Sequence, residues 1–564
     1  MAKTEKRREH LREAGCILVF FLLSFLYVLP PAMRKDLILG DDTRYHLNRI
    51  LEMTDHLRHG DFRPYTYTWS FGKISLPIGI FYPQFTLYPF ALGTLITDNW
   101  VTGIYAGIAF YTFLTLLNTY LAVRRMDGSR EQAFLTALLY AFCSYRFFDA
   151  FTRFALGEYL SMTFLPLVLY GFYAVFFGRK RDWWVLGLGM GLLLWSHVLS
   201  PFLTVLFLIP VGVVSLFFMK EKAARLVRLL PAAGLALLVG AVFWIPMAEQ
   251  ETAQTFEQPS PYELAQMALH PLQLLSSSFR NHFYDMDVNG NVYNIGIVLM
   301  ATAIAGLFLW HFMSVRCRVT WLLGCAAVVL STTVIPWRYL QNTPISLIQF
   351  PWRFLMLASL FLSCAAGEMV CTIPGRAVRR HVLSAALGAV VLVLYFGSVC
   401  GYLSVNGAIH THLTAEDDIC EEEASISEYL PVEAEGQVED LKNHMAVLDG
   451  VRKSLSPETI QSGVNTQIYT DPDLVEADTA ELPAAWYKNL HVYQKVGEDL
   501  VECLVRKSAR GMVEADLYGD GVVYLVYEPS FADHLSAVLT LAGIVLTIVL
   551  AVQRLFQRSK PIKA

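Results

Sequence analysis

The sequence has little charge for its length. Asp, Glu, Lys and Arg make up 16% of its 564 residues, whereas a soluble chain carries about 25%. Hydrophobic residues make up 55%, so most of the chain must face lipid rather than water. This composition excludes a disordered, collagen-like or disulfide-scaffold protein. The net charge is −5 and no block of basic residues is present, so we expect no nucleic-acid partner.

Several common site motifs are missing as well. The nine cysteines contain no C-x-x-C pair, which argues against a zinc ribbon or a thioredoxin-type site. No Walker loop, HExxH zinc motif, GxSxG elbow or dinucleotide fingerprint stands in a supporting context. Cys420 and Cys503 lie in the one long polar region, where a disulfide in an oxidising compartment and two free thiols both fit.

Long apolar runs are abundant and predict about twelve transmembrane helices. The first follows a basic N-terminal stretch at about residue 16. The others lie near 100–123, 131–149, 158–178, 183–197, 201–219, 229–247, 292–312, 319–336, 352–372, 382–404 and 534–553. With this count the inner loops hold fifteen Lys and Arg residues and the short outer loops five, as the positive-inside rule requires. We therefore expect a multi-pass protein of the cell membrane with both termini in the cytoplasm.

Residues 81–97 are expected to be a re-entrant segment, because they are short and hold Pro83 and Pro89. Counting them as a further span would reverse the charge bias of every later loop. The predicted organisation is a transmembrane domain over 1–404 with a first outer loop at 34–99, an outer domain over 405–531, and a last helix and tail over 532–564. The outer region holds 25 acidic and 8 basic residues, and its second half alternates as strands do (HVYQKV, LVECLVRK, GVVYLVYEP). The fold class is therefore all-α polytopic with a small β-rich C-terminal domain.

The first outer loop carries the first candidate site. Asp42, His46 and Arg49 stand at i, i+4 and i+7, so a helix would place them on one face. They could form a site with the neighbouring Asp41, since carboxylates deprotonate hydroxyls or hold metals. The alternative is that Asp42 only caps the helix and the other residues form a solvated face.

A second cluster, Asp149, Arg153 and Glu158, lies where two predicted spans meet the outer surface. Ionisable groups at a membrane edge are costly unless they are paired or hydrated. A site residue set is one interpretation, and an Asp149–Arg153 pair that only ties the loop is the other. His197, at the end of the fifth span, is a candidate for the same site or a satisfied interface residue.

The last cluster is the run Gln349-Phe350-Pro351-Trp352-Arg353 at the start of the tenth span. Arg353 could bind a phosphate or extend toward lipid headgroups. Under the predicted topology, all four sites lie on the outer face: the first-loop residues, the Asp149–Glu158 cluster, His197 and the Gln349–Arg353 run. Such a set suits chemistry on an anionic lipid-linked substrate. No metal ligand set or other cofactor is predicted, although a divalent metal is left open.

These segments also carry a family resemblance. The runs GDDTRYHLNRI, FYPQFTLYPF, RFALGE, SHVLS and IQFPWRF resemble the bacterial membrane family labelled "6-pyruvoyl-tetrahydropterin synthase-related", which looks like a relative of the glycosyltransferase C (GT-C) superfamily. The segment LPAAWYKNLHVYQKVG is similar to the outer β domain of such proteins, from which Ala484-Ala485-Trp486 departs.

The resemblance implies an enzyme of the outer face of the bacterial cell membrane that uses polyprenyl-phosphate sugars. Its general base would be an acidic residue of the first outer loop, here Asp42 with Asp41 as its neighbour. The other positions that match the family motifs, or that lie in the same clusters, are expected to bind substrate: His46, Arg49, Asp149, Arg153, Glu158, His197, Gln349 and Arg353.

The expected function is therefore transfer of a hexosyl or pentosyl group from a polyprenyl-phosphate donor to an envelope glycopolymer or lipid acceptor. Two other classes stay open. One is a transporter or flippase of lipid-linked saccharides, which charge at mid-span would favour. The other is a non-catalytic envelope assembly factor that uses the outer domain as a binding module.

Overall fold

The computed structural model describes residues 2–257, 262–281, 283–285, 290–372, 377–417, 419, 429–518 and 521–559. Most of these residues are helical, as the apolar runs predict. The helices of the transmembrane part and its loops are α1 (Ala2–Ala32), α2 (Thr43–Arg58), α3 (Ile78–Phe81), α4 (Tyr88–Thr97), α5 (Trp100–Arg125), α6 (Arg130–Ala141), α7 (Ser144–Phe147), α8 (Leu156–Phe176), α9 (Trp183–Leu194), α10 (Leu199–Ser215), α11 (Lys222–Leu226), α12 (Leu229–Ala253), α13 (Leu264–Met267), α14 (Pro271–Arg280), α15 (Gly296–Leu309), α16 (Val315–Leu330), α17 (Phe354–Thr372), α18 (Ala377–Ile409) and α21 (Phe531–Ser559).

Seven helices among the described residues are long and apolar enough to cross a membrane. They contain or overlap α1, α5, α8, α12, α17, α18 and α21, so the protein is a multi-pass membrane protein. A helix also lies at each of the five other predicted spans. These helices (α6, α9, α10, α15 and α16) have only 12 to 17 residues. The sequence count of about twelve therefore exceeds the number of full-length helices.

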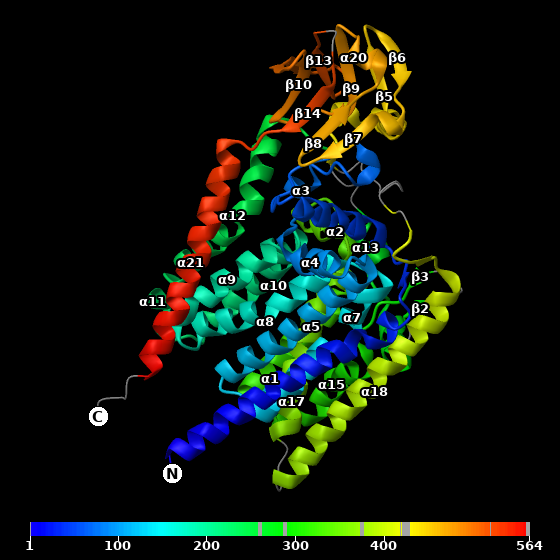
Figure 1. Cartoon of the computed structure of the whole chain (residues 1–564). Helices are drawn as coiled ribbons and strands as arrows, with labels where there is room; N and C mark the ends of the chain where they lie inside the picture. Colours follow the sequence, from blue (N-terminus) through cyan, green and yellow to red (C-terminus); the bar gives the residue numbers. More distant parts are fainter. Residues whose placement is uncertain are drawn as a thin grey trace.

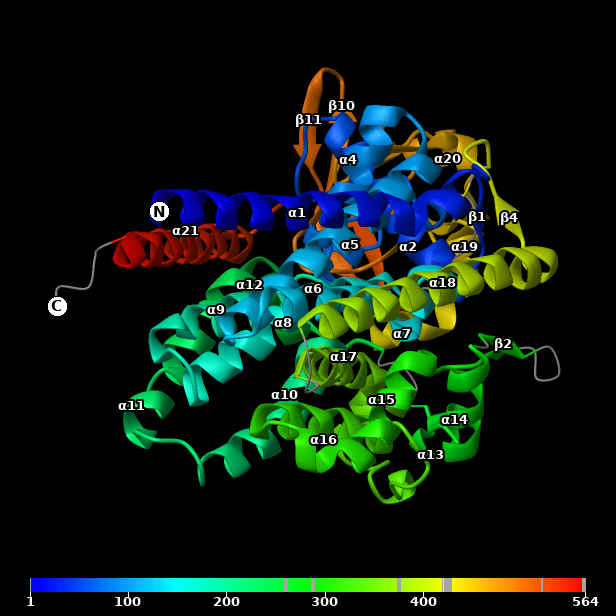
Figure 2. The same ribbon diagram turned by 90° about the horizontal axis from the view of Figure 1, so that it is seen from below.

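The helices form an interior and a periphery. The apolar stretches of α17 and α8 are 89% and 78% buried inside the protein, whereas those of α21, α1 and α18 are only 22%, 33% and 33% buried. The peripheral helices thus leave most of their apolar surface for lipid. Seen from below in Figure 2, α1 and α21 lie toward one side of the view and α15 and α16 toward the opposite side, with α18 between them.

Segment 81–97 contains no helix as long as the seven described above. It forms α3, a short turn and the ten-residue helix α4, which is about 15 Å long at 1.5 Å per residue. Helix α4 packs against α5 and α2. Helix α4 alone is thus about half as long as the hydrocarbon core of a membrane, about 30 Å, and the re-entrant position of the segment stays a prediction.

The C-terminal domain is built of strands, as predicted. One five-stranded sheet has the order β11-β10-β14-β8-β7 and the other β12-β13-β9-β5-β6. Every neighbouring pair is antiparallel. The bounds are β5 (Met445–Leu448), β6 (Val451–Ser454), β7 (Ile460–Gly463), β8 (Thr466–Tyr469), β9 (Thr479–Ala485), β10 (Leu490–Val496), β11 (Asp499–Glu502), β12 (Leu504–Lys507), β13 (Met512–Asp516) and β14 (Val523–Tyr527), with the short helices α19 (Val438–Lys442) and α20 (Pro472–Val475) between strands.

Strand formation starts earlier than the sequence pattern suggests, since β5 begins at Met445. The predicted run LVECLVRK is also divided between two sheets, because β11 and β12 pair with different partners on either side of Cys503. Cys503 is buried. Cys420 lies outside the described residues, so its predicted pairing with Cys503 is not described.

The β-domain and the first outer loop share one apolar core. Tyr67, Ile78 and Phe81 of the loop are buried in the same cluster as Leu482 and Tyr487 of the domain. The short strands β1 (Leu37–Ile38) and β4 (His412–Leu413) pair with each other, and their buried side chains belong to the core of the helix bundle. The β-domain stands at one end of the molecule, and the N-terminal end of α1 and the C-terminal end of α21 lie at the other (Figure 1).

Candidate active site next to the β-domain

Asp42 is positioned by the start of helix α2 but does not cap it. The residue occupies the N-cap position, yet its side chain accepts no hydrogen bond from the helix. Its carboxylate is 43% exposed and lies 3.9 Å from Nη2 of Arg153. The capping alternative therefore does not account for this side chain. His46 and Arg49, on the same helix, are only 3% and 1% exposed, so the alternative of a solvated face is wrong.

The predicted span over 131–149 is interrupted at its outer end. Helix α6 ends at Ala141, and the chain continues through α7 into a π-helical turn over Phe148–Thr152. Such turns often occur at functional sites. Phe154 then adopts a left-handed φ of 57°, and α8 begins at Leu156. This irregular backbone replaces the last turns of a regular helix and brings Asp149, Arg153 and Glu158 to one place.

Arg153 is the centre of the site. Its Nη1 lies 3.4 Å from Oδ1 of Asp149 and 3.4 Å from Oε1 of Glu158. Its Nε and Nη2 lie 4.0 Å from Asp41 and 3.9 Å from Asp42. The predicted Asp149–Arg153 pair therefore exists, but it is one contact of four. Arg153 is 5% exposed, so its pairs with the buried Asp149 and Glu158 form where water screens them weakly. Asp41 and Asp42 are 51% and 43% exposed.

Glu158 joins the outer loop of the tenth predicted span to this centre. Nε of Arg353 donates to Oε1 of Glu158 at 2.5 Å, and the Tyr145 hydroxyl donates to Oε2 at 2.7 Å. Nη1 of Arg353 donates to the Ile348 carbonyl at 2.9 Å and to Oε1 of Gln349 at 2.8 Å. Arg353 is 7% exposed, so the alternative of a lipid-facing arginine does not hold.

Gln349 is held in an uncommon conformation, with φ 60° and ψ −51°. This region costs free energy for a residue with a side chain. The bond from Arg353 and the backbone bond from the Gln349 N–H to the Ser346 carbonyl at 2.9 Å oppose that cost. Local strain of this kind is often found at functional sites.

His46, Tyr82 and His197 form the other side of the site. The Tyr82 ring lies 5.9 Å from the His46 ring and 6.1 Å from the His197 ring. A Cβ on Gly157 would stand 2.5 Å from the Tyr82 hydroxyl and 2.8 Å from the His197 ring. Both side chains therefore stand against the first turn of α8. His197 is 6% exposed and is hydrogen-bonded to Ser200 at 2.8 Å.

The two acidic residues of the first outer loop have raised pKa values. Burial among the surrounding protein atoms raises the pKa of Asp42 to about 6, with a further increase from Asp41, against the lowering effect of Arg153. Burial also raises the pKa of Asp41, opposed by Arg153 and by a hydrogen bond from Asn291. Burial lowers the pKa of His46 well below its usual value, and Arg49 adds to this. At neutral pH Asp42 is ionised and His46 is neutral.

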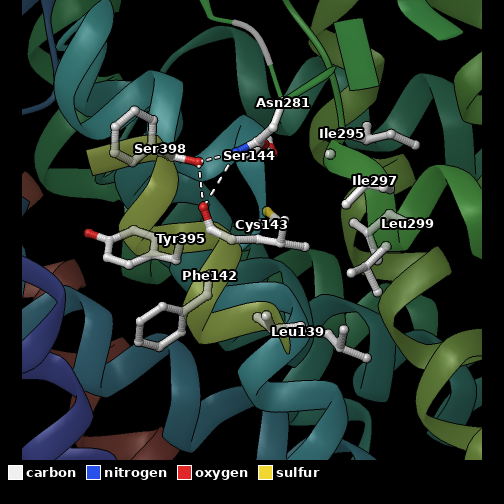
Figure 3. A pocket seen from close by; sticks show the side chains of 15 residues that line it. Leu139, Phe142, Cys143, Ser144, Asn281, Ile295, Ile297, Leu299, Tyr395 and Ser398 are labelled. Atoms are coloured by element: carbon white, nitrogen blue, oxygen red, sulfur yellow. Dashed lines mark hydrogen bonds between the residues drawn. The ribbon is translucent and has the colours of Figure 1, made fainter. Parts of the chain in front are cut away.

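Hydrogen bonds beside a small cavity hold the irregular segment that follows α6. Ser144 of α7 donates to Oδ1 of Asn281 at 3.3 Å, and Nδ2 of Asn281 donates to Ser398 of α18 at 2.5 Å (Figure 3). The cavity beside them has a volume of about 30 Å³. These bonds hold α7 against α14 and α18.

A larger apolar groove runs between α8, α9, α10 and α12. Its volume is about 600 Å³. Leu194 and Pro201, at one end, flank the connection that carries His197, and Phe176, Leu216 and Leu229 line the other end. The groove thus runs from the far half of the helix bundle to the two residues that flank the His197 connection.

All ten predicted site residues lie in one of two neighbouring groups. Asp41, Asp42, Asp149, Glu158, Arg153, Arg353 and Gln349 form one contact network, which we call the carboxylate–arginine network. His46, Arg49 and His197 meet at Tyr82. The sequence patterns indicated no role for Tyr82 or Tyr145. Only the position of Tyr82 directly before Pro83 in the FYPQF run indicated a structured segment. Among the described residues, no group of three or more His, Cys, Asp and Glu side chains is placed to hold a metal ion.

Three solved structures have folds similar to that of this chain, at low identity. The cryo-EM structure of the arabinofuranosyltransferase AftD from Mycobacteria has a TM-score of 0.43 and 13% identity, over 68% of this chain and 26% of that chain. ArnT from Cupriavidus metallidurans has a TM-score of 0.37 and 14% identity in the apo state, over 72% of this chain and 77% of that chain. Its structure bound to undecaprenyl phosphate has a TM-score of 0.35 and 13% identity, over 70% of this chain and 72% of that chain.

The chain thus spans about a quarter of the length of AftD. No family model matches the sequence. No curated protein matches it.

Proposed function

We propose that the protein is a membrane glycosyltransferase of the GT-C type that transfers a sugar from a polyprenyl-phosphate donor to a cell-envelope acceptor. The observation that carries this proposal is the partly exposed Asp42 carboxylate beside Arg153, which itself belongs to a buried network with Arg353. A base next to cations suits a reaction that removes a proton at one atom and releases an anionic phosphate at another.

In the proposed reaction, Asp42 takes the proton from an acceptor hydroxyl. The hydroxyl oxygen then forms a bond to the anomeric carbon of the donor sugar, and the bond from that carbon to the phosphate oxygen breaks. The leaving group is polyprenyl phosphate, which departs with the electron pair. Attack from the face opposite the phosphate inverts the anomeric configuration. A pKa of about 6 keeps Asp42 ionised at neutral pH yet basic enough to accept a proton.

The leaving phosphate would lie at the start of α8. The N–H groups of Gly157 and Glu158 lie in the first turn of this helix, and no acceptor meets them within the described part of the chain. A helix start is favourable for anions. Arg153 and Arg353 flank this turn through Glu158. Together they would stabilise the charge that develops on the phosphate.

The isoprenoid chain of the donor would occupy the apolar groove between α8, α9, α10 and α12. The groove is lined almost entirely by aliphatic and aromatic side chains, and one end of it reaches the His197 connection. A lipid chain anchored there would hold its phosphate at the level of the site. This placement argues for a lipid-linked donor rather than a soluble nucleotide sugar.

Donor turnover tests the proposal. The protein in lipid nanodiscs is incubated with radiolabelled polyprenyl-phosphate sugars and crude envelope acceptor. Asp42→Asn is expected to lose transfer, and Asp98→Asn is the matched control, because Asp98 is a 90% exposed carboxylate of the same loop. Loss in Asp41→Asn but not in Asp42→Asn would assign the base to Asp41. No transfer from any donor by folded protein would contradict the enzyme assignment and favour transport or a binding role of the β-domain.

The groove is tested separately with photoactivatable undecaprenyl phosphate. Ala236→Trp fills the groove and is expected to reduce crosslinking strongly. Leu230→Trp is the control, since Leu230 is 73% exposed on the same helix and lies outside the groove lining. Equal crosslinking in the two variants would contradict this location of the lipid chain.

The proposed membrane orientation places the β-domain outside the cell and both termini in the cytoplasm. The ends of α1 and α21 that lie away from the β-domain support this arrangement (Figure 1). A fluorescent reporter fused after Ala564 is expected to be fluorescent, and protease added to intact spheroplasts is expected to reach the β-domain. The opposite result would reverse the topology.

A further inference from the structure

Arg49 is closed off from substrate by its own contacts. Its side chain is 1% exposed. Nη1 donates to Nδ1 of His46 at 3.1 Å, and Nη2 donates to the Pro83 carbonyl. The guanidinium carbon stands 4.1 Å from the centre of the Tyr82 ring. The guanidinium group is therefore enclosed by an imidazole, a carbonyl and an aromatic face, and it has no room to bind a further ligand.

The contact with Arg49 decides where the proton of His46 lies. A guanidinium group only donates hydrogen bonds, so Nδ1 of His46 must supply the lone pair. A neutral imidazole with an unprotonated Nδ1 carries its hydrogen on Nε2. Protonation of Nδ1 would put two donors against each other and add a second positive charge beside Arg49. His46 is therefore fixed both in charge and in tautomer.

With Nδ1 engaged by Arg49, Nε2 is the nitrogen of His46 that remains for another partner. Within the described residues, no hydrogen-bond partner meets Nε2, although the ring itself is only 3% exposed. The ring stands between Tyr82, at 5.9 Å, and Phe154, at 6.5 Å, the residue that follows Arg153. Tyr82 also stands against the first turn of α8, so an N–H donor on this ring would add to the N–H groups at the start of that helix.

We propose that Arg49 is a positioning residue that fixes His46 with its proton on Nε2, so that His46 donates a hydrogen bond to a phosphate oxygen of the lipid donor. The identity of that ligand rests on the proposed function, whereas the tautomer does not. Arg49 acts only through His46 and Tyr82 and does not touch substrate. Lysine could not replace it, because one ammonium group cannot span two acceptors in the fixed fork of a guanidinium and stack on a ring.

The first test reads the tautomer directly. Protein with ¹⁵N-labelled histidine is placed in nanodiscs, and His46→Gln identifies the His46 signals among the 14 histidines. The wild type is expected to show an unprotonated Nδ1 and a protonated Nε2. In Arg49→Ala a mixture of tautomers is expected, and added guanidinium ions should restore the single form. A protonated Nδ1 in the wild type would overturn the proposal without any Arg49 variant, even if such a variant failed to fold.

The second test reads binding of undecaprenyl phosphate. Glutamine at position 46 places its amide NH₂ near the position of Nε2, whereas asparagine reaches only the position of Nδ1. We therefore expect His46→Gln to bind nearly as the wild type, and His46→Asn to bind up to about tenfold more weakly, the effect of one hydrogen bond. Equal binding by both variants would refute donation to the phosphate. Arg153→Gln distinguishes a failure of the His46 proposal from a failure of the proposed phosphate site. If this variant also binds undecaprenyl phosphate like the wild type, the proposed phosphate site itself is contradicted.

Discussion

The backbone N–H of Asp42 donates a hydrogen bond to the Arg153 carbonyl at 2.8 Å, and the Arg153 guanidinium stands 3.9 Å from the Asp42 carboxylate. Two segments more than a hundred residues apart are thus joined through backbone and side chain at once. The backbone bond sets the distance between the chains, and the side-chain pair sets the charge next to the proposed base. Because both contacts involve the same two residues, a small backbone shift would change the chemistry of Asp42.

Gly40 makes this close approach feasible. A Cβ at Gly40 would stand 2.5 Å from the Thr152 carbonyl oxygen and 3.1 Å from that of Arg153. Gly40→Ala is expected to push Asp42 away from Arg153 and to lower transfer by about a hundredfold, as misplacement near a reacting group does. Gly401→Ala, in open space, is the control. Transfer at wild-type rate in Gly40→Ala, measured in the nanodisc assay, would show that this contact does not position the base.

The pH dependence of transfer should report Asp42. Its pKa is raised to about 6, and a base acts only when it is deprotonated. The kcat/KM value is therefore expected to be constant at neutral pH and to fall tenfold per pH unit below about 6. An acid limb near pH 4, the usual range of an aspartate, would mean that the surrounding protein atoms do not raise the pKa of Asp42.

Glu158 should be essential for folding as well as for activity. It is 2% exposed and pairs with Arg153 and Arg353. Removal of one partner from a buried ion pair costs about 3–5 kcal/mol, so Glu158→Gln is expected to lower the thermal stability of the detergent-solubilised protein markedly.

A double variant provides the control for this effect. Glu158→Gln combined with Arg353→Met removes one positive charge together with the carboxylate, while Asp149 still balances Arg153. The double variant is expected to be more stable than Glu158→Gln alone. If it is less stable by the full sum of the single effects, the two side chains do not interact as described.

A second buried cluster should make stability depend on pH. Nδ1 of His56 lies 2.6 Å from Asp61, and Nε2 lies 3.4 Å from Glu52. Burial lowers the pKa of His56, but the bonds to Asp61 and Glu52 outweigh it and raise the pKa to about 9. The stabilisation is therefore complete below the unfolded pKa of about 6.5 and is lost as the pH rises through 9.

Thermal unfolding of the wild type and of His56→Asn checks this dependence. The difference in Tm should be largest below pH 6.5 and should shrink toward pH 9. His59→Asn, on the exposed side of Trp69, should show no such trend. A difference that grows with pH would mean that His56 is neutral in the folded protein.

The β-domain shows where sequence patterns were sufficient and where they were not. The alternation in HVYQKV and GVVYLVYEP predicted β10 and β14. The hairpin β5–β6 was missed, although Asp449-Gly450 is a typical two-residue turn, with φ 47° and 84°. Its strands have only four residues each, too few for a clear alternation.

The candidate site, too, could be predicted from sequence patterns only in part. The spacing of Asp149 and Arg153 and the order Gln349–Arg353 indicated local pairs, which are present. The 2.5 Å contact between Arg353 and Glu158 joins residues 195 positions apart, and no local pattern encodes such a distance. Tyr82 was overlooked because an aromatic residue in an apolar run looks the same whether it faces lipid or a site.

The sequence by itself determined that the chain enters the membrane many times, approximately where the long apolar helices lie, and that a β-rich domain follows. Apolar length and period dictate these features because each depends on neighbouring residues alone. Only the tertiary structure decided that α6 breaks before Asp149, that Arg49 contacts His46 and the Tyr82 ring, and that Arg153 gathers four carboxylates. Those outcomes depend on which helices meet, and buried charges are stable only when the packing of distant segments brings them a partner.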